Sequence, residues 1–177
     1  MNDICLTALN GVEQQTIDTV LSCYRDHCQY VKKAGIYSNE HGPLDPNRDA
    51  LMSLKAELSV PVSCYIDDTG HFNAVEFNIC YNQMMYLLMA HGVEQGILDI
   101  GIADLAEFKQ RMLSDILIIE MKNKFRQAIC DDKIYGTVSI HQCVLKRNLY
   151  IVKTSCQFFD SQGGKQFGDV TAAVLKH

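Results

Sequence analysis

The sequence predicts an α+β fold in which a curved antiparallel sheet wraps round one long central helix. The first observation is an apolar stretch between Thr69 and Gly92 whose hydrophobic residues recur at helical spacing. The second is that the chain after residue 112 changes to a period of two residues, which is typical of strands. One helix can cover so large a sheet only if the sheet curls round it. That arrangement is the hot-dog architecture, and we expect residues 1–177 to form a single domain of this kind.

The elements before the long helix are short. Residues 12–24 place their apolar side chains near helical spacing, which predicts an amphipathic helix. Residues 35–49 are rich in Gly, Pro, Asn and Asp and predict a loop. Residues 51–66 alternate apolar and polar side chains and predict an extended strand. Pro61 marks a bulge or a sheet edge in that strand, because proline has no N–H for the ladder.

The long helix has recognisable signals at both ends. Asn73, followed three residues later by Glu76, fits a capping pair at its start, with Thr69 as the alternative cap. Gly92 fits the position just after its last turn. Two apolar rows indicate a helix that is buried over most of its surface. The rows are Phe77, Tyr81, Met84 and Leu88, and Phe72, Val75, Ile79 and Tyr86.

The chain beyond the long helix predicts mainly strands. Residues 103–112 indicate one further short helix. Strands are expected over residues 113–128, 134–145, 149–159 and 167–175. Because only short turns separate the last three strands, we expect them to form an antiparallel meander.

The composition excludes several classes of protein. The formal net charge is −5, and a mildly acidic chain lacks the basic surface that nucleic-acid binding needs. The N-terminus has no basic segment followed by an apolar run. No window approaches the roughly 18 uninterrupted apolar residues of a membrane span. We therefore expect a cytoplasmic protein without a membrane span.

The eight cysteines are widely scattered along the chain. No pair has CxxC spacing, and a chain of this length without a secretion signal does not need a disulfide framework. Cys23, His27 and Cys28 lie close together in the sequence, but their spacing indicates a metal site only weakly. We expect reduced, mostly buried thiols and no metal.

Several polar residues interrupt the apolar stretch. Glu76 is its only acid, and a buried carboxylate must find a partner or act as a proton acceptor. Asn78 and Asn82 share one face, so their burial would require partners or a polar cleft. His71 lies beside the helix start, whose positive end favours a carbonyl oxygen that gains negative charge. The plainer alternative for His71 is a hydrogen-bonded residue of a turn.

Within this stretch, TGHFNAVEFNICYNQMMY (residues 69–86) closely resembles the signature of the FcoT-like fatty acyl thioesterase family. The resemblance extends upstream through CYRDHCQYV (23–31) and SCYI (63–66), and it covers most of the chain. It implies a hot-dog fold and an enzyme that acts on fatty acyl thioesters of coenzyme A or acyl carrier protein. It implies no cofactor apart from the carrier's own pantetheine.

Members of this family resemble two kinds of enzyme. Some look like acyl thioesterases, which hydrolyse the thioester. Others are similar to enzymes of isonitrile-lipopeptide or β-amino-acid biosynthesis, which add the amine of glycine to C3 of a 2-enoyl thioester before hydrolysis. The family's polar site matches Tyr24, Tyr65, Asn73 and Asn82 here. The chain departs from the family in residues 35–49 and 91–105, so acyl chain length does not transfer.

One mechanism fits the residues and the resemblance together. It places the thioester carbonyl at the start of the long helix, where backbone N–H groups near Phe72 and Asn73 would stabilise its oxygen. Asn82 would orient the water or the amine, and His71 or Glu76 would be the base. The two tyrosines would position substrate or deliver a proton, although each also fits an ordinary core aromatic.

Substrate contacts are expected on the helix and on one strand. The candidates for the acyl chain are Phe72, Phe77, Met84, Met85 and Leu88, for which core packing is the alternative. The candidates for the phosphates of the carrier are Lys122, Lys124 and Arg126, for which a solvated face is the alternative.

Other functions fit the sequence less well. A hot-dog dehydratase would need a G-D-x-N-P-like loop, and DDTGHFN has its residues in a different order. A non-catalytic protein that binds acyl thioesters is the alternative from a different class. A purely structural domain leaves the polar residues of the helix unexplained. By analogy with the fold, we expect a homo-oligomer built from dimers.

Overall fold

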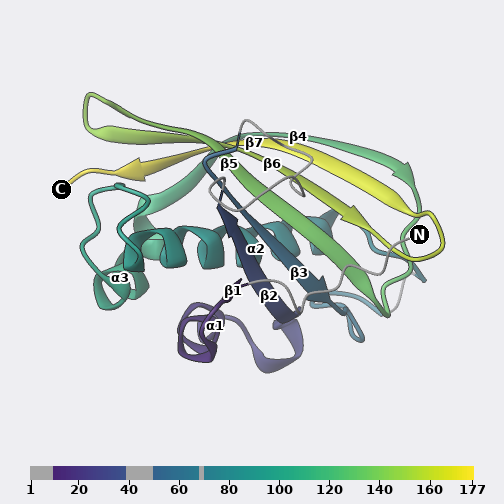
Figure 1. Ribbon diagram of the computed structural model, residues 1–177. Coiled ribbons are helices and arrows are strands. Elements are labelled where there is room, and N and C mark those ends of the chain that lie inside the picture. Colours follow the sequence, from purple (N-terminus) through teal and green to yellow (C-terminus); the bar gives the residue numbers. More distant parts are fainter. Residues whose placement is uncertain (1–9, 39–49, 68–69) are drawn as a thin grey trace.

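The computed structural model describes residues 10–38, 50–67 and 70–177 (Figure 1). Its seven strands form one antiparallel sheet in the order β1-β2-β3-β5-β6-β7-β4. The long helix α2 lies along one face of this curved sheet, as predicted (Figure 1). In chain order the elements are β1 (Asn10–Gly11), α1 (Gln14–Leu21), the 3-10 turn η2 (Asp26–Cys28), β2 (Val31–Ser38), β3 (Met52–Leu58), α2 (Ala74–Glu94), α3 (Leu105–Asp115), β4 (Ile116–Gln127), β5 (Ile134–Lys146), β6 (Leu149–Phe159) and β7 (Lys165–Leu175).

The start of α2 confirms the predicted capping pair. The side-chain oxygen of Asn73 accepts hydrogen bonds from the N–H groups of Val75 and Glu76, and the carboxylate of Glu76 accepts one from the N–H of Asn73. This reciprocal arrangement satisfies three N–H groups that the helix itself cannot pair. The first turn of α2 is therefore held in a fixed geometry.

The predicted end of α2 at Gly92 is wrong, because the helix continues to Glu94. A Cβ at Gly92 would lie 2.8 Å from the Cβ of Leu98, which is closer than side chains approach. The N–H groups of Ile97 and Leu98 both donate to the carbonyl of Gly92. Glycine is needed there so that the following segment can fold back against the helix.

An aromatic cluster fixes the start of α2 to the sheet. The ring of Phe158 on β6 lies 5.3 Å from that of Phe72 and 4.9 Å from that of Phe77. All three side chains are fully buried. Burial of each is worth roughly 1.5–3 kcal/mol, so the cluster holds the capped end of the helix in place.

Strand β2 was not predicted, and the loop predicted from residue 35 is wrong over the described residues up to 38. A register shift between Val31 and Lys33 interrupts the alternation that would have indicated a strand. The rest of that loop, residues 39–49, lies outside the described residues. The predicted strand over 51–66 is shorter, since β3 ends at Leu58.

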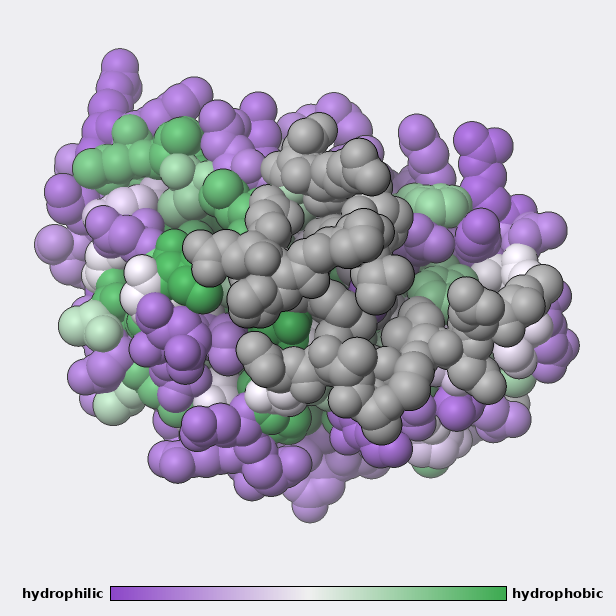
Figure 2. All heavy atoms as spheres, viewed as in Figure 1, coloured by the Kyte–Doolittle hydropathy of each residue, from purple (hydrophilic) through white to green (hydrophobic). Residues whose placement is uncertain are grey.

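The later elements agree with the sequence within a few residues, and β5, β6 and β7 form the predicted meander. The described cysteines are all unpaired thiols. No helix within the described ranges is both long and apolar enough to cross a membrane. Outside the atoms drawn in grey, the face shown in Figure 2 is mostly hydrophilic, with groups of hydrophobic residues between.

Candidate active site

Some of the residues proposed from the sequence line two separate cavities near the start of α2. The first, which we call the α2-start pocket, has a volume of about 310 Å³. The second, the acidic pocket, has a volume of about 240 Å³. The α2-start pocket is lined by His71, Phe72, Asn73, Ala74, Phe125, Arg126, Gln127, Ala128 and Gln166. The acidic pocket is lined by Val60, Pro61, Val62, Ser63, Ile66, Asp67, Glu76 and Asp131.

The backbone N–H groups expected to bind an oxyanion are already used. The N–H of Phe72 donates to the carbonyl of Ile129 at 3.0 Å, and the N–H of Asn73 donates to the Glu76 carboxylate at 3.2 Å. The next N–H, that of Ala74, forms no hydrogen bond with the residues that the structure describes. Ala74 is exposed and lines the α2-start pocket. The available donor at the helix start is therefore one residue later than expected.

Gln166 on β7 lines the same pocket and carries a buried acceptor that the sequence reasoning missed. Its side chain is only 2% exposed, and its Nε2 donates to the carbonyl of Phe72 at 3.0 Å. Since only the NH₂ of an amide can donate to a carbonyl, this bond fixes the orientation of the amide. The buried Oε1 has no hydrogen-bond partner among the described residues. An unpaired buried acceptor costs on the order of 1–3 kcal/mol, so a donor that reached Oε1 would be bound favourably.

The two candidate bases face different cavities. His71 is exposed and lines the α2-start pocket together with Ala74 and Gln166. Glu76 is 2% exposed, belongs to the helix cap and lines the acidic pocket. The sequence left the choice between them open. The geometry favours His71, because it lines the same cavity as Ala74 and Gln166.

The remaining polar residues implied by the family resemblance lie outside the α2-start pocket. Tyr24 is partly buried, and burial raises the pKa of its hydroxyl above the usual range, with Tyr86 nearby adding to the shift. Tyr65 is 51% exposed and lies in the segment after β3. Asn82 is partly accessible on α2, one turn beyond Asn78. Of the four tyrosine and asparagine positions, only Asn73 lines this pocket.

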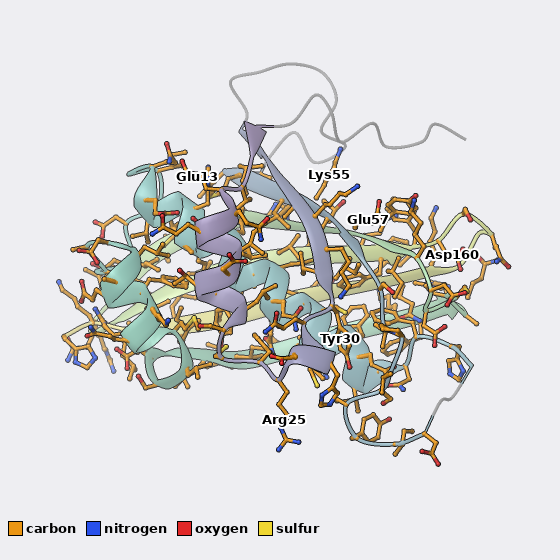
Figure 3. The ribbon with its side chains drawn as sticks, turned by 90° about the horizontal axis from the view of Figure 1, so that it is seen from below. Glu13, Arg25, Tyr30, Lys55, Glu57 and Asp160 are labelled. Atoms are coloured by element: carbon orange, nitrogen blue, oxygen red, sulfur yellow. The ribbon has the colours of Figure 1, made fainter. Side chains whose placement is uncertain are left out.

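Gln83 shows that one polar residue of the helix has a structural role. Its Oε1 accepts hydrogen bonds from the N–H groups of Tyr30 and Val31, and its Nε2 donates to the carbonyl of Cys28. The distances are 3.0, 3.2 and 2.6 Å. Tyr30, labelled beside α2 in Figure 3, also donates from its hydroxyl to the carbonyl of Val62. The buried amide thus joins the η2–β2 segment to α2.

The residues expected to contact an acyl chain belong to the closed core. Each is at most 1% exposed, and Phe72 alone among them lines a cavity described above. The sulfur of Met84 packs against Gly136, where a Cβ would lie 2.6 Å away. The set is Phe72, Phe77, Met84, Met85 and Leu88. Their contact with substrate stays a prediction and requires these side chains to move apart.

A bulge in β4 sets Arg126 apart from the other two cations, Lys122 and Lys124. The Phe125 ring packs on the Phe77 ring of α2, 5.5 Å between centroids, so its neighbour Lys124 points to the other face of the strand. Lys122, which shares that face, forms an exposed ion pair with Glu120 at 2.8 Å. The register shifts between Phe125 and Gln127, so Arg126 is the extra residue of a bulge. Arg126 lines the α2-start pocket, whereas Lys122 and Lys124 do not.

Comparison with known proteins gives consistent results. The model of the FcoT-like thioesterase domain matches residues 19–174. A (2E)-enoyl-[ACP] glycyltransferase from Streptomyces coeruleorubidus is 33% identical over 171 residues, which cover 92% of this chain and 97% of the relative. A protein of the same name from Mycobacterium marinum is 27% identical and covers 84% of this chain and 78% of its own.

Two solved structures share the fold at low sequence identity. A candidate thioesterase from Shewanella oneidensis superposes with a TM-score of 0.55 at 9% identity and covers 92% of this chain and 99% of its own. One from Syntrophus aciditrophicus gives a TM-score of 0.54 at 8% identity and covers 91% and 95%. At such identities the likeness concerns the fold alone, and it confirms the predicted architecture.

Proposed function

Because this chain belongs to the family of FcoT-like thioesterase domains, we propose that it adds the amine of glycine to C3 of a 2-enoyl thioester carried by an acyl carrier protein. The protein is an enzyme of the thioesterase-like type, as its family and its relatives indicate. Hydrolysis of the thioester is proposed as the second step. The observation that carries this proposal is the α2-start pocket, which His71, Ala74 and Gln166 line together.

Both reactions place negative charge on the thioester oxygen. In conjugate addition, the amine nitrogen forms a bond to C3 and the π electrons of C2=C3 move onto the carbonyl as an enolate. In hydrolysis, water adds to the carbonyl carbon and the charge collects on the same oxygen. The Ala74 N–H and the positive end of α2 stabilise that oxygen in either case.

His71 is assigned the proton transfers. The imidazole has a ring nitrogen that can accept a proton and later return it, as general acid–base catalysis requires. In the addition step it takes the proton that the amine loses and delivers it to C2, which balances the reaction. In hydrolysis it takes a proton from water and returns it to the departing thiolate.

A second copy of the chain is expected to complete the site. β4 is an edge strand whose exposed residues include Leu117, Ile118 and Ile119. Beside it, the stripe of α2 that contains Asn78 and Asn82 remains partly accessible. Pairing of two copies along β4 would cover both surfaces. It would also close the α2-start pocket, because residues of β4 line it.

Product analysis tests the proposed function. The purified protein is incubated with a medium-chain 2-enoyl thioester, with and without glycine, while mass spectrometry follows products and a thiol reagent follows release of the carrier. A glycine adduct supports the proposal. Thiol release without an adduct, matched by a saturated acyl thioester, would make the protein a plain thioesterase. Absence of both reactions across several chain lengths would favour the acyl-thioester-binding protein instead.

A further inference from the structure

We propose that the α2-start pocket contains the subsite for the amino acid, with the Oε1 of Gln166 accepting a hydrogen bond from the amine and Arg126 binding the carboxylate. The inference rests on the proposed function and extends it by naming the residues that recognise the second substrate. It concerns a small α-amino acid, for which the relatives' glycine is the first candidate.

The unpaired acceptor of Gln166 selects an N–H donor. The reacting end of an enoyl thioester offers only acceptors, namely the carbonyl oxygen and the sulfur, and it cannot satisfy Oε1. An amine can satisfy it and still keep its lone pair for C3. The bond from Nε2 to the carbonyl of Phe72 prevents the amide from turning its NH₂ toward the pocket. Gln166 therefore distinguishes the nucleophile from the thioester.

The charges around the pocket place a carboxylate there. Arg126 is exposed and forms no ion pair with the residues described by the structure. Among the residues placed by the structure, none that lines the α2-start pocket is acidic, whereas Asp67, Glu76 and Asp131 line the acidic pocket. A guanidinium binds a carboxylate through two parallel hydrogen bonds, which fixes the orientation of the amino acid. An amino acid anion would therefore enter the α2-start pocket and be repelled from the acidic one.

The donors and acceptors then match the two substrates without conflict. The Ala74 N–H remains for the thioester oxygen, the Oε1 of Gln166 binds the amine and Arg126 binds the carboxylate. His71 lines the same cavity and can take the proton that the amine loses. Holding the amine and the enoyl carbon in one cavity makes their reaction effectively intramolecular.

Substitution of Arg126 tests the carboxylate contact. The phosphate of a carrier is a competing anion, so the substrate is a 2-enoyl thioester of N-acetylcysteamine, which has no phosphate. Arg126→Ala should raise the KM for glycine at least tenfold, and Arg126→Lys should restore part of the loss. Wild-type enzyme should use glycinamide, which lacks the carboxylate, about as poorly as the Ala variant uses glycine. Arg25→Ala is the matched control, because Arg25 is exposed and points away from the molecule in Figure 3.

Two outcomes would overturn the assignment of Arg126. One is an unchanged KM for glycine in Arg126→Ala. The other is a defect seen only with carrier-bound substrate, which would assign Arg126 to the phosphate. Formation of an adduct by the wild type shows that the proposed function stands even if the subsite is wrong. A wild type that forms no adduct would instead contradict the proposed function.

Substitution of Gln166 tests the amine contact. Gln166→Leu removes the acceptor at similar volume, whereas Gln166→Glu keeps an acceptor but gives up the Nε2 hydrogen bond to the carbonyl of Phe72. Gln166→Leu should reduce glycine addition at least tenfold more than it reduces thiol release from a saturated acyl thioester, and Gln166→Glu should retain more of the addition. Equal loss of both reactions in Gln166→Leu, with a lowered Tm, would show that Gln166 only supports the helix start.

Discussion

The side-chain NH₂ of Gln166 donates a hydrogen bond to the carbonyl oxygen of Phe72 at 3.0 Å, although the two residues are 94 positions apart. This bond joins β7 to the residue that precedes the cap of α2. It also leaves the Oε1 of Gln166 buried and unpaired against the residues that the structure describes. A structural contact thus prepares a polar group for a ligand at the helix start.

His71→Ala should reduce turnover roughly 100- to 10,000-fold, the range that general acid–base groups contribute. Because His71 is exposed, the Tm should change little. The measurement is kcat for adduct formation and for thiol release. His27→Ala, which removes an exposed histidine of η2, is the control. Full activity of a folded His71→Ala variant would return the role of base to Glu76.

Asn73→Ala should lower the free energy of unfolding by about 1 kcal/mol, because it removes the acceptor for two N–H groups of α2. Asn73→Ser should retain most of the stability, since serine also caps helices. Denaturant titration of the three proteins measures the difference. Equal stability of wild type and Asn73→Ala would contradict the capping role.

The stability of the protein should depend on Asp115 at low pH. Hydrogen bonds from Arg111, Ser114 and His177 lower the pKa of this carboxyl to about 2. A carboxyl whose folded pKa lies below its usual value stabilises the fold above that usual value, 3.8, and loses its contribution as the pH falls toward 2.

The corresponding measurement compares the Tm of wild type and Asp115→Asn between pH 6 and 2 (roughly the range over which the linkage acts). The wild type should be the more stable at the upper end, and the difference should shrink as the carboxyl is protonated. A difference that stays constant over this range would show that the ionisation of Asp115 does not contribute.

Ile119→Lys should weaken self-association, because it places a charge among the exposed apolar residues of the edge strand β4. Sedimentation analysis should find wild type as a dimer or a larger assembly of dimers and the variant shifted toward monomer, with reduced activity. Leu145→Lys, in an exposed part of β5, is the control and should not dissociate the protein. A monomeric and fully active wild type would contradict a site that a second copy completes.

Much of the fold was predictable from local signals, whereas contacts between distant segments were not. The capped start of α2 and the three-strand meander follow from spacing within a few residues. Strand β2 was missed because its bulge breaks the alternation. Gly92 was misread as a helix end, since its contact with Leu98 cannot be inferred from propensity.

The site was predictable only where local signals place its residues. His71 and Asn73 precede α2 directly and could be placed beside its positive end. The Phe72 N–H donates to the carbonyl of Ile129, which is distant in the sequence, and local signals could not predict this bond. The available donor is therefore the N–H of Ala74. Gln166 had one available signal. It lies on the buried face of β7 together with Gly168 and Val170. Its polarity at that position could have indicated a role.

The most direct test of the central claim is the position of the new bond in the product. The wild-type enzyme is given ¹⁵N-labelled glycine and a 2-enoyl thioester labelled with ¹³C at C3, and the ¹³C spectrum of the product is recorded. We predict a saturated C3 resonance split by coupling to ¹⁵N, which would show a carbon–nitrogen bond at C3. A product in which C3 remains olefinic, with thiol released, would contradict glycine addition and leave thioester hydrolysis as the activity.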